Sequence, residues 1–407
     1  MLNSPDNPLV ILEFANNHMG DDELYREMVD DYAAVARDYP YFKFAIKLQY
    51  RDLDTFIHPD YKGGDHSGVQ RFESTKVTVD EWSSRIDYAI SKGFLVGCTP
   101  FDEVSVDEVL NDKRLAFLKI GSCSFNDWPF LEKIRKELSS RGQKTTVIAS
   151  TGGMSLDTVD KVVSFLTKSS TIELALMHCV AEYPSKIENQ NLSWINVLSH
   201  RYQTPVGFST HEDGEEESSG AYAFCLGASI FEKHVVSSSA KTVNAYSANP
   251  DQIRKWLDRI VEASKYVGEP KARVMNLEIE NKYLNGFRRG VFARNKLDKG
   301  VLSYDDIYLA FPRVDGQLTA NDLSNYINYD VQDSIDTDKP ISFTTVESID
   351  ARSKIDEIRD FVSGILREAK IEVHSGTSIE VSHHYGLERY DEVGLSMITL
   401  VNLEYCK

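Results

Sequence analysis

Eight short apolar runs alternate with helix-length amphipathic segments along the first 265 residues of this chain of 407 residues. The runs are apolar almost throughout, which is typical of strands buried on both faces, and they cover residues 9–15, 42–49, 94–101, 116–122, 145–151, 172–179, 205–211 and 228–235. Eight strand–helix units of this total length predict an α/β fold, a (β/α)8 TIM barrel. A doubly wound open sheet is the competing architecture, since the number of strands alone does not exclude it.

One connection inside this region is unusually long. Residues 51–79 join the second run to its helix without a clear periodic pattern. Connections of this length in compact domains are usually lids or binding loops, so we expect a functional loop on the catalytic face of the barrel. A disordered insertion is the alternative.

The pattern changes after the barrel, which we predict to span residues 1–265. Residues 266–286 read as a linker, and residues 287–348 as a small β-rich domain with short strands and turn signals. The remaining segment, 349–407, begins with an amphipathic helix and ends on an apolar strand with no closing element. We therefore expect the natural polypeptide to continue beyond this point.

Composition excludes several classes of protein. With 63 acidic residues against 45 Lys and Arg, the formal charge is −18, the opposite of what a nucleic-acid or anionic-membrane binder needs. There is no apolar run long enough to span a membrane and no signal-peptide pattern at the N-terminus. Five cysteines without close pairs argue against a disulfide scaffold or a structural zinc site. A cytoplasmic protein is the expectation.

Polar residues interrupt the apolar runs almost only at their C-terminal ends. They are Glu13, Asn16, Asn17, His18, Lys47, Gln49, Thr99, Lys119, Ser122, Ser150, Thr151, His178, Glu182, Tyr183, Ser209, His211, Glu232, Lys233 and His234. In a barrel these ends meet at one rim, where active sites form.

The residue types at this rim indicate a ligand. Two lysines, Lys47 and Lys119, with several hydroxyls and the backbone amides of the STGG stretch can hold a phosphate dianion. A buried ammonium needs a counter-charge, and the alternative to an anionic ligand is a Lys–Glu pair with Glu13 or Glu232. His211 and His234 could bind one divalent cation, or could be structural.

Taken in order, the strand-end motifs resemble those of the sialic acid synthases, the phosphoenolpyruvate-condensing nonulosonate synthases. The matching stretches are LEFANNHMG, IKLQ, CTPFDEVSVDEVL, FLKIGSCSFNDWPFLEKI, IASTGGMS, LMHCVAEYPSK, PVGFSTHE and LGASIFEKHV. RRGVFARNKLDKGVLSYDDI then resembles the start of the antifreeze-like (SAF) domain of this family, and the C-terminal tail resembles the beginning of a cupin domain.

The resemblance implies a reaction between phosphoenolpyruvate and an N-acylated or otherwise modified aldose, giving a nonulosonate-type 2-keto sugar acid and phosphate. It also implies a divalent metal, Mn²⁺ or Mg²⁺, and a domain-swapped homodimer in which an arginine reaches the partner's site. Carried onto this chain, phosphoenolpyruvate would contact Lys47, Thr99, Lys119, Ser122, Ser150 and Ser209. The metal would be held by His211 and His234, and Glu13, Gln49, Tyr183, Glu232 and Arg313 would serve the acceptor, the attacking water or the partner's site.

Three departures fall on the sugar half of the site. The family's acidic residue after KIGS is Ser124 here, its polar residue before the EYP tyrosine is Ala181, and its later aspartate is absent, with Asn244 nearest. Arg313, in FPRVDG, is also displaced from the usual Arg-Pro-Gly. The resemblance therefore predicts the reaction type but does not identify the acceptor. Another phosphate-binding barrel aldolase and a non-catalytic sugar-binding or regulatory protein stay open as alternatives.

Overall fold

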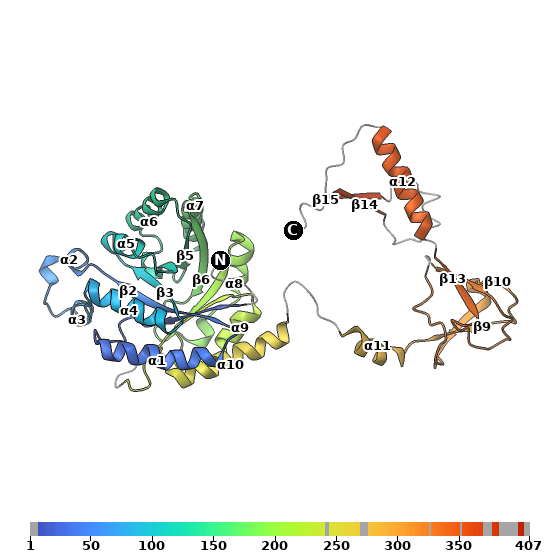
Figure 1. Cartoon of the computed structure of the whole chain (residues 1–407), viewed down its shortest axis with the longest axis horizontal. Helices are drawn as coiled ribbons and strands as arrows, with labels where there is room; N and C mark the ends of the chain where they lie inside the picture. Colours follow the sequence, from blue (N-terminus) through green and yellow to red (C-terminus); the bar gives the residue numbers. More distant parts are fainter. Residues whose placement is uncertain are drawn as a thin grey trace. The chain divides into compact units, whose positions relative to one another are not determined.

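The chain forms two compact units, residues up to Val274 and residues from Met275, in the computed structural model (Figure 1). The structure describes residues 7–240, 244–268, 276–324, 327–350, 352–368, 377–381 and 398–402. In this part of the chain no helix is long and apolar enough to cross a membrane.

The first unit is a closed barrel of eight parallel strands in sequence order, which confirms the predicted TIM barrel and excludes the open sheet. The strands are β1 (Leu9–Glu13), β2 (Lys43–Tyr50), β3 (Leu95–Pro100), β4 (Phe117–Ile120), β5 (Thr145–Ser150), β6 (Ile172–Cys179), β7 (Val206–Thr210) and β8 (Ile230–His234). Their polar ends are adjacent in register: Glu13 pairs with Lys47 on one side and His234 on the other, and Ser209 pairs with Glu232.

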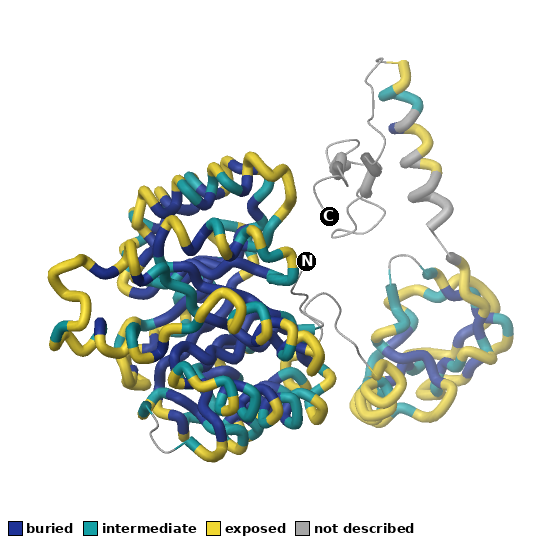
Figure 2. The backbone as a smooth tube through the Cα atoms, turned by 60° about the vertical axis from the view of Figure 1, so that its left-hand side comes forward, coloured by how far each residue is buried: buried dark blue, intermediate teal, exposed yellow. Residues whose placement is uncertain are grey.

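Helices cover the outside of the barrel, and the strands between them are buried (Figure 2). The helices are α1 (Asp22–Asp38), α4 (Val79–Ser91), α5 (Glu103–Asn111), α6 (Trp128–Arg141), α7 (Leu156–Thr167), α8 (Trp194–Tyr202), α9 (Ser219–Cys225) and α10 (Pro250–Val267). α10 begins as its sequence predicts, because Asn249 and Gln252 form a reciprocal capping box around Pro250.

The lower interior of the barrel is filled by apolar side chains, which confines the polar ones to the C-terminal rim. Phe117 reaches so close to Gly97 that a Cβ there would lie 2.1 Å from its ring. Gly207 is equally confined, since a Cβ would lie 2.4 Å from the carbonyl oxygen of Ile230. These glycines let bulky neighbours close the barrel floor.

The long connection after β2 contains more regular structure than its sequence predicts. It holds the short helices α2 (Leu53–Phe56) and α3 (Ser67–Ser74), with a 3-10 turn at Pro59–Tyr61. Leu53, Ile57 and Val69 form a small buried cluster with Phe72 against it. The alternative of a disordered insertion is therefore wrong; the few apolar residues of this segment pack against each other, a pattern too short to show helical periodicity.

The second unit is built of small antiparallel sheets and separate helices. Its elements are α11 (Leu277–Asn285), β9 (Gly290–Ala293), β10 (Gly300–Val301), β11 (Ile307–Ala310), β12 (Ile327–Val331), β13 (Val346–Asp350), α12 (Arg352–Glu368), β14 (Thr377–Val381) and β15 (Ile398–Asn402). β9 pairs with β11, and β10, β12 and β13 form a three-stranded sheet over a core that includes Val291, Leu318 and Ile341.

The predicted linker differs from expectation, and most of the C-terminal tail lies outside the described residues. The predicted linker 266–286 contains the helix α11, although residues 269–275 are not described. In the cupin-like tail only β14 and β15 are described, and they pair antiparallel.

Candidate active site

Four charged side chains meet inside the barrel at the strand ends. Glu232 Oε1 on β8 accepts from Lys47 Nζ (3.1 Å), from Lys119 Nζ (3.3 Å) and from Ser209 Oγ (3.0 Å). Lys47 also forms an ion pair with Glu13, whose Oε1 accepts from the Ala15 amide (2.6 Å). All these charged groups are buried. The Lys–Glu pairing that the sequence left open is therefore present, with both glutamates.

The paired lysines still have capacity for an anion. Each ammonium has three protons, so a shared carboxylate does not saturate them. Burial opposes the charge of Lys47, but Glu13 and Glu232 outweigh it and raise its pKa. Burial lowers the pKa of Lys119, and the opposing charge of Glu232 does not outweigh this effect. For Glu232, burial alone would raise the pKa, but Lys119 and Lys47 lower it well below its usual range.

Buried hydroxyls surround this cluster, and two of them are unsatisfied. Among the described residues, the Thr99 and Ser150 hydroxyl oxygens have no hydrogen-bond partner, although both side chains are buried. Ser122 Oγ accepts from the Gly152 amide (3.1 Å) and contacts Cys179 Sγ (3.1 Å). A Cβ on Gly152 would lie 2.8 Å from Ser122 Oγ, so glycine is required for this close approach. The Thr99 and Ser150 hydroxyls can therefore each donate a hydrogen bond to a polar ligand.

The two predicted metal-binding histidines lie side by side. The ring centroids of His211 and His234 are 5.4 Å apart. His211 Nδ1 donates to the Val180 carbonyl (2.9 Å), which leaves its Nε2 lone pair available. Burial, with the charge of His234, lowers the pKa of His211 to about 4; burial, with Lys47, lowers that of His234 to about 3. Both imidazoles are therefore neutral at pH 7, the form that binds metals.

The two histidines are not joined by a larger group of metal-binding side chains among the described residues. Among the described residues no group of three or more His, Cys, Asp or Glu could hold a metal ion. The two neutral imidazoles fit a site in which water or substrate would supply the remaining ligands. His18 and His178 form hydrogen bonds to neighbouring groups: His18 Nδ1 accepts from the Gly20 amide and His178 Nε2 donates to the Gln190 carbonyl.

Aromatic rings line the mouth above the histidines. Tyr183, half exposed, has its ring 4.2 Å from that of His211. Tyr246 packs edge-on against His234 at 5.1 Å and against Tyr183 at 5.3 Å. Sequence reasoning included Tyr183 and missed Tyr246, which lies on the irregular segment after β8, where no periodic pattern shows the direction of a side chain.

Gln49 lies next to a second residue that was missed, Arg51. Gln49 Oε1 accepts from both terminal nitrogens of Arg51, at 3.1 Å each. The sequence does carry a signal for Arg51. Lys47, Gln49 and Arg51 are spaced two residues apart, so their side chains are expected on the same face of the strand and its continuation.

At the positions that depart from the family in the sugar half of the site, Ser124 and Asn244 carry no charge. Ser124 is buried in the turn after β4, and Asn244 Nδ2 donates to Asn17 Oδ1 (3.2 Å). Arg313 lies in the second unit after β11, where its Nε donates to the Asn285 carbonyl (2.9 Å). The structure therefore gathers the predicted site residues of the barrel, and Arg313 is described only within its own unit.

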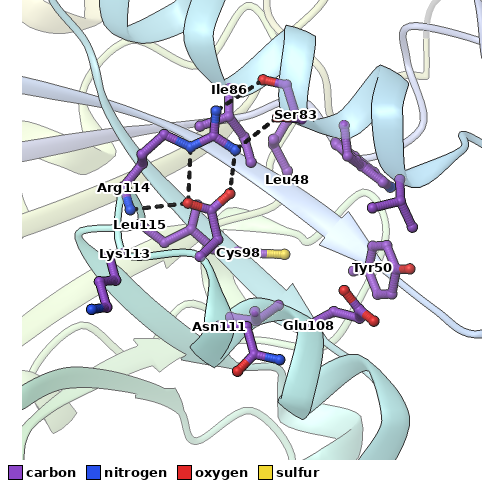
Figure 3. A pocket seen from close by; sticks show the side chains of 14 residues that line it. Leu48, Tyr50, Ser83, Ile86, Cys98, Glu108, Asn111, Lys113, Arg114 and Leu115 are labelled. Carbon is purple, nitrogen blue, oxygen red and sulfur yellow. Dashed lines mark hydrogen bonds and ion pairs between the residues drawn. The ribbon is translucent and has the colours of Figure 1, made fainter.

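A separate cavity with a mostly apolar lining lies on the outside of the barrel (Figure 3). It measures about 440 Å³ and is lined by Leu48, Tyr50 and Cys98 from the outer faces of β2 and β3, and by residues of α4 and α5. Its Arg114 is held by Asp112 and Ser83. Because strand residues alternate, these side chains point away from Lys47 and Thr99. The buried lysines, Glu232 and the unpaired hydroxyls lie at the strand ends instead.

Comparison with known proteins agrees with this geometry. The sequence model of the NeuB family matches residues 44–272, more than half of the chain. A solved structure described as a spore coat polysaccharide biosynthesis protein E of Chromobacterium violaceum is 39% identical, with a TM-score of 0.77, covering 84% of this chain and all of that one. The N-acetylneuraminic acid synthetase of Leptospira borgpetersenii is 26% identical, with a TM-score of 0.59, covering 69% and 93%. The N,N'-diacetyllegionaminic acid synthase of Campylobacter jejuni is 26% identical over 72% of this chain and 86% of its own. The resemblance drawn from the strand-end motifs is confirmed: the chain belongs to the NeuB family.

Proposed function

We propose that this protein condenses phosphoenolpyruvate with a modified aldose to give a nonulosonate-type 2-keto sugar acid and phosphate. The observation that carries the proposal is the cluster at the strand ends of a NeuB-family barrel. There, two buried lysines share the carboxylate of Glu232, and the Thr99 and Ser150 hydroxyls lack partners. A phosphate dianion would supply the missing acceptors for these donors.

In the proposed reaction, C3 of phosphoenolpyruvate forms a bond to the aldehyde carbon, water adds at C2, and phosphate leaves by C–O cleavage. Lys47, Lys119 and the hydroxyls hold the phosphate. Glu232, kept ionised by the two lysines, would accept a hydrogen bond from the attacking water and so help to place it. A divalent ion held by His211 and His234 would act as a Lewis acid on the aldehyde oxygen.

The acceptor is expected to differ from that of a typical sialic acid synthase. Ser124 and Asn244 stand where the family has carboxylates, and Asn244 is bonded to Asn17. Sites built to hydrogen-bond particular groups reject analogues that lack them by up to about 10⁴–10⁵-fold. We expect weak or no turnover of N-acetylmannosamine and better turnover of a deoxy-diacetamido hexose or another modified aldose.

The test is phosphate release across a panel of aldoses, with phosphoenolpyruvate present or omitted. Release that needs both substrates supports the synthase and excludes a non-catalytic protein. No release with any aldose would contradict the proposal. Trapping of pyruvate on Lys47 or Lys119 by borohydride would instead indicate a Schiff-base aldolase. A higher kcat/KM for N-acetylmannosamine than for the modified aldoses would overturn the expected preference.

We propose further that residues 287–348 form an antifreeze-like domain that completes the partner's site in a domain-swapped homodimer, through Arg313. The support is the family's usual arrangement and the separation of this part as its own unit. The tail after residue 349 is proposed to begin a cupin-like segment.

Truncation after Gly268, which caps α10, is expected to leave a folded barrel without turnover. The core of the barrel belongs to the first unit, so its thermal unfolding should stay cooperative. Circular dichroism measures the folding of the truncated barrel, and phosphate release measures its turnover. Arg313→Ala in the full chain tests the same proposal with a single substitution. Full activity of the isolated barrel would contradict the domain swap.

A further inference from the structure

Cys179 ends β6 and faces the interior of the barrel. Met177 belongs to the apolar cluster inside the barrel, so Cys179, two residues further along the strand, faces the same side. Cys179 pairs in register with Ser209, one of the residues proposed to contact phosphoenolpyruvate. His178, which sequence reasoning selected at this strand end, faces the other side, where its Nε2 donates to the Gln190 carbonyl. The inward-facing polar group at the end of β6 is therefore the thiol of Cys179.

Three neighbouring strand ends meet at the hydroxyl of Ser122. Ser122 lies in the turn after β4, Gly152 follows β5, and Cys179 ends β6. The Gly152 amide donates to Ser122 Oγ (3.1 Å), and Cys179 Sγ lies 3.1 Å from the same oxygen. A Cβ on Gly152 would lie 2.7 Å from Cys179 Sγ and 2.8 Å from Ser122 Oγ. Glycine at this position therefore permits the contact among the three groups.

The Ser122 hydroxyl has one proton and two lone pairs, and the Gly152 amide occupies one of the lone pairs. The contact with Cys179 fits either direction of donation, from the hydroxyl to the sulfur or from the thiol to the oxygen. Burial raises the pKa of Cys179 and outweighs the hydrogen bond to Ser122 and the charge of Lys119, so the thiol keeps its proton at pH 7.

A bound phosphate decides between the two directions. Thiol sulfur is a weak acceptor of hydrogen bonds, whereas the charged oxygens of a phosphate are strong acceptors. The Ser122 proton therefore gains more from a phosphate oxygen than from Cys179 Sγ. The remaining lone pair of Ser122 Oγ is then available to the thiol proton of Cys179.

We infer that Cys179 is a positioning residue of the phosphate site: its thiol donates to Ser122 Oγ and, with the Gly152 amide, occupies both lone pairs of that oxygen. The Ser122 proton is thereby directed to the phosphate of phosphoenolpyruvate. Ser150, at the end of β5, is buried with no hydrogen-bond partner among the described residues, and it offers a further hydroxyl proton at the adjacent strand end. The inference rests on the proposed condensation and adds to it a residue that acts through Ser122.

The experiment compares Cys179→Ala, which removes the thiol, with Cys179→Ser, which keeps a proton donor at this position. Cys179→Ala should raise KM for phosphoenolpyruvate about 3- to 10-fold, the effect of one lost hydrogen bond, and leave kcat within about twofold. Cys179→Ser should keep KM within about twofold of the wild-type value, because its hydroxyl can donate to Ser122.

A double variant tests whether Cys179 acts through Ser122. In a Ser122→Ala background, Cys179→Ala should cause no further rise in KM, because the group that the thiol positions is already absent. Cys98→Ala is the matched control, since Cys98 is a buried cysteine of β3 that lines the cavity on the outside of the barrel. Thermal unfolding of each variant confirms folding, and calorimetric titration with phosphoenolpyruvate alone measures binding independently of turnover.

The outcomes separate this inference from the proposed function. If a folded Cys179→Ala protein keeps the wild-type KM, or if its effect adds to that of Ser122→Ala, the condensation stands and the positioning role is wrong. If Cys179→Ser loses as much as Cys179→Ala, the thiol only fills space, which also overturns the inference.

If the wild type releases no phosphate with any aldose, the proposed function fails, and calorimetry decides the role of Cys179. The wild type should then still bind phosphoenolpyruvate, and Cys179→Ala should bind it about 3- to 10-fold more weakly. Equal binding by the two proteins, or no binding by the wild type, would overturn the inference.

Discussion

Replacing Lys119 by methionine is expected to raise KM for phosphoenolpyruvate about 10- to 100-fold, because a charge-assisted contact is worth about 1.5–3 kcal/mol. Lys119 is buried near the end of β4, where it forms an ion pair with Glu232. Methionine keeps most of the volume and removes the charge. Glu232 keeps its contacts with Lys47 and Ser209, so the barrel should still fold.

The measurement is initial-rate kinetics with varied phosphoenolpyruvate, accompanied by thermal unfolding of each variant. Lys133→Met is the matched control, because Lys133 forms ion pairs with Asp107 and Glu137 on the helical surface. An unchanged KM for phosphoenolpyruvate in a folded Lys119→Met protein would mean that the buried lysine only balances Glu232. The phosphate site would then have to be placed elsewhere.

Replacing His211 or His234 by alanine is expected to lower metal-dependent turnover by more than about 100-fold, since each removes one of two proposed protein ligands. Burial keeps both imidazoles neutral and available for coordination. The variants should also bind Mn²⁺ more weakly, which a titration without substrates measures independently of activity.

His200→Ala serves as the control, because His200 lies on the exposed surface of α8, where its Nδ1 forms a hydrogen bond with the Asn196 carbonyl. If the wild type keeps full activity after chelation, or if both variants bind Mn²⁺ as the wild type does, the histidines are structural. In either case the metal assignment is wrong.

Much of the barrel follows directly from the order of residues. Apolar runs of strand length, separated by amphipathic segments, can bury both their faces only under a layer of helices, and eight of them suffice to close a barrel. The cap of α10 is equally local, because Asn249, Pro250 and Gln252 interact within one turn. The gathering of polar strand ends also follows, since parallel strands place their C-terminal ends on one rim.

Only the tertiary structure decided how these groups pair. The sequence left Glu13 and Glu232 as equal partners for the buried lysines; closure of β8 against β1 brings Glu232 to both lysines, and Glu13 only to Lys47. The position of Tyr246 depends on a segment without periodicity, where the direction of the side chain is set by packing against His234. Strand periodicity determines which side a residue faces, whereas contacts between distant residues depend on the register of the closed barrel, and no local pattern encodes that register.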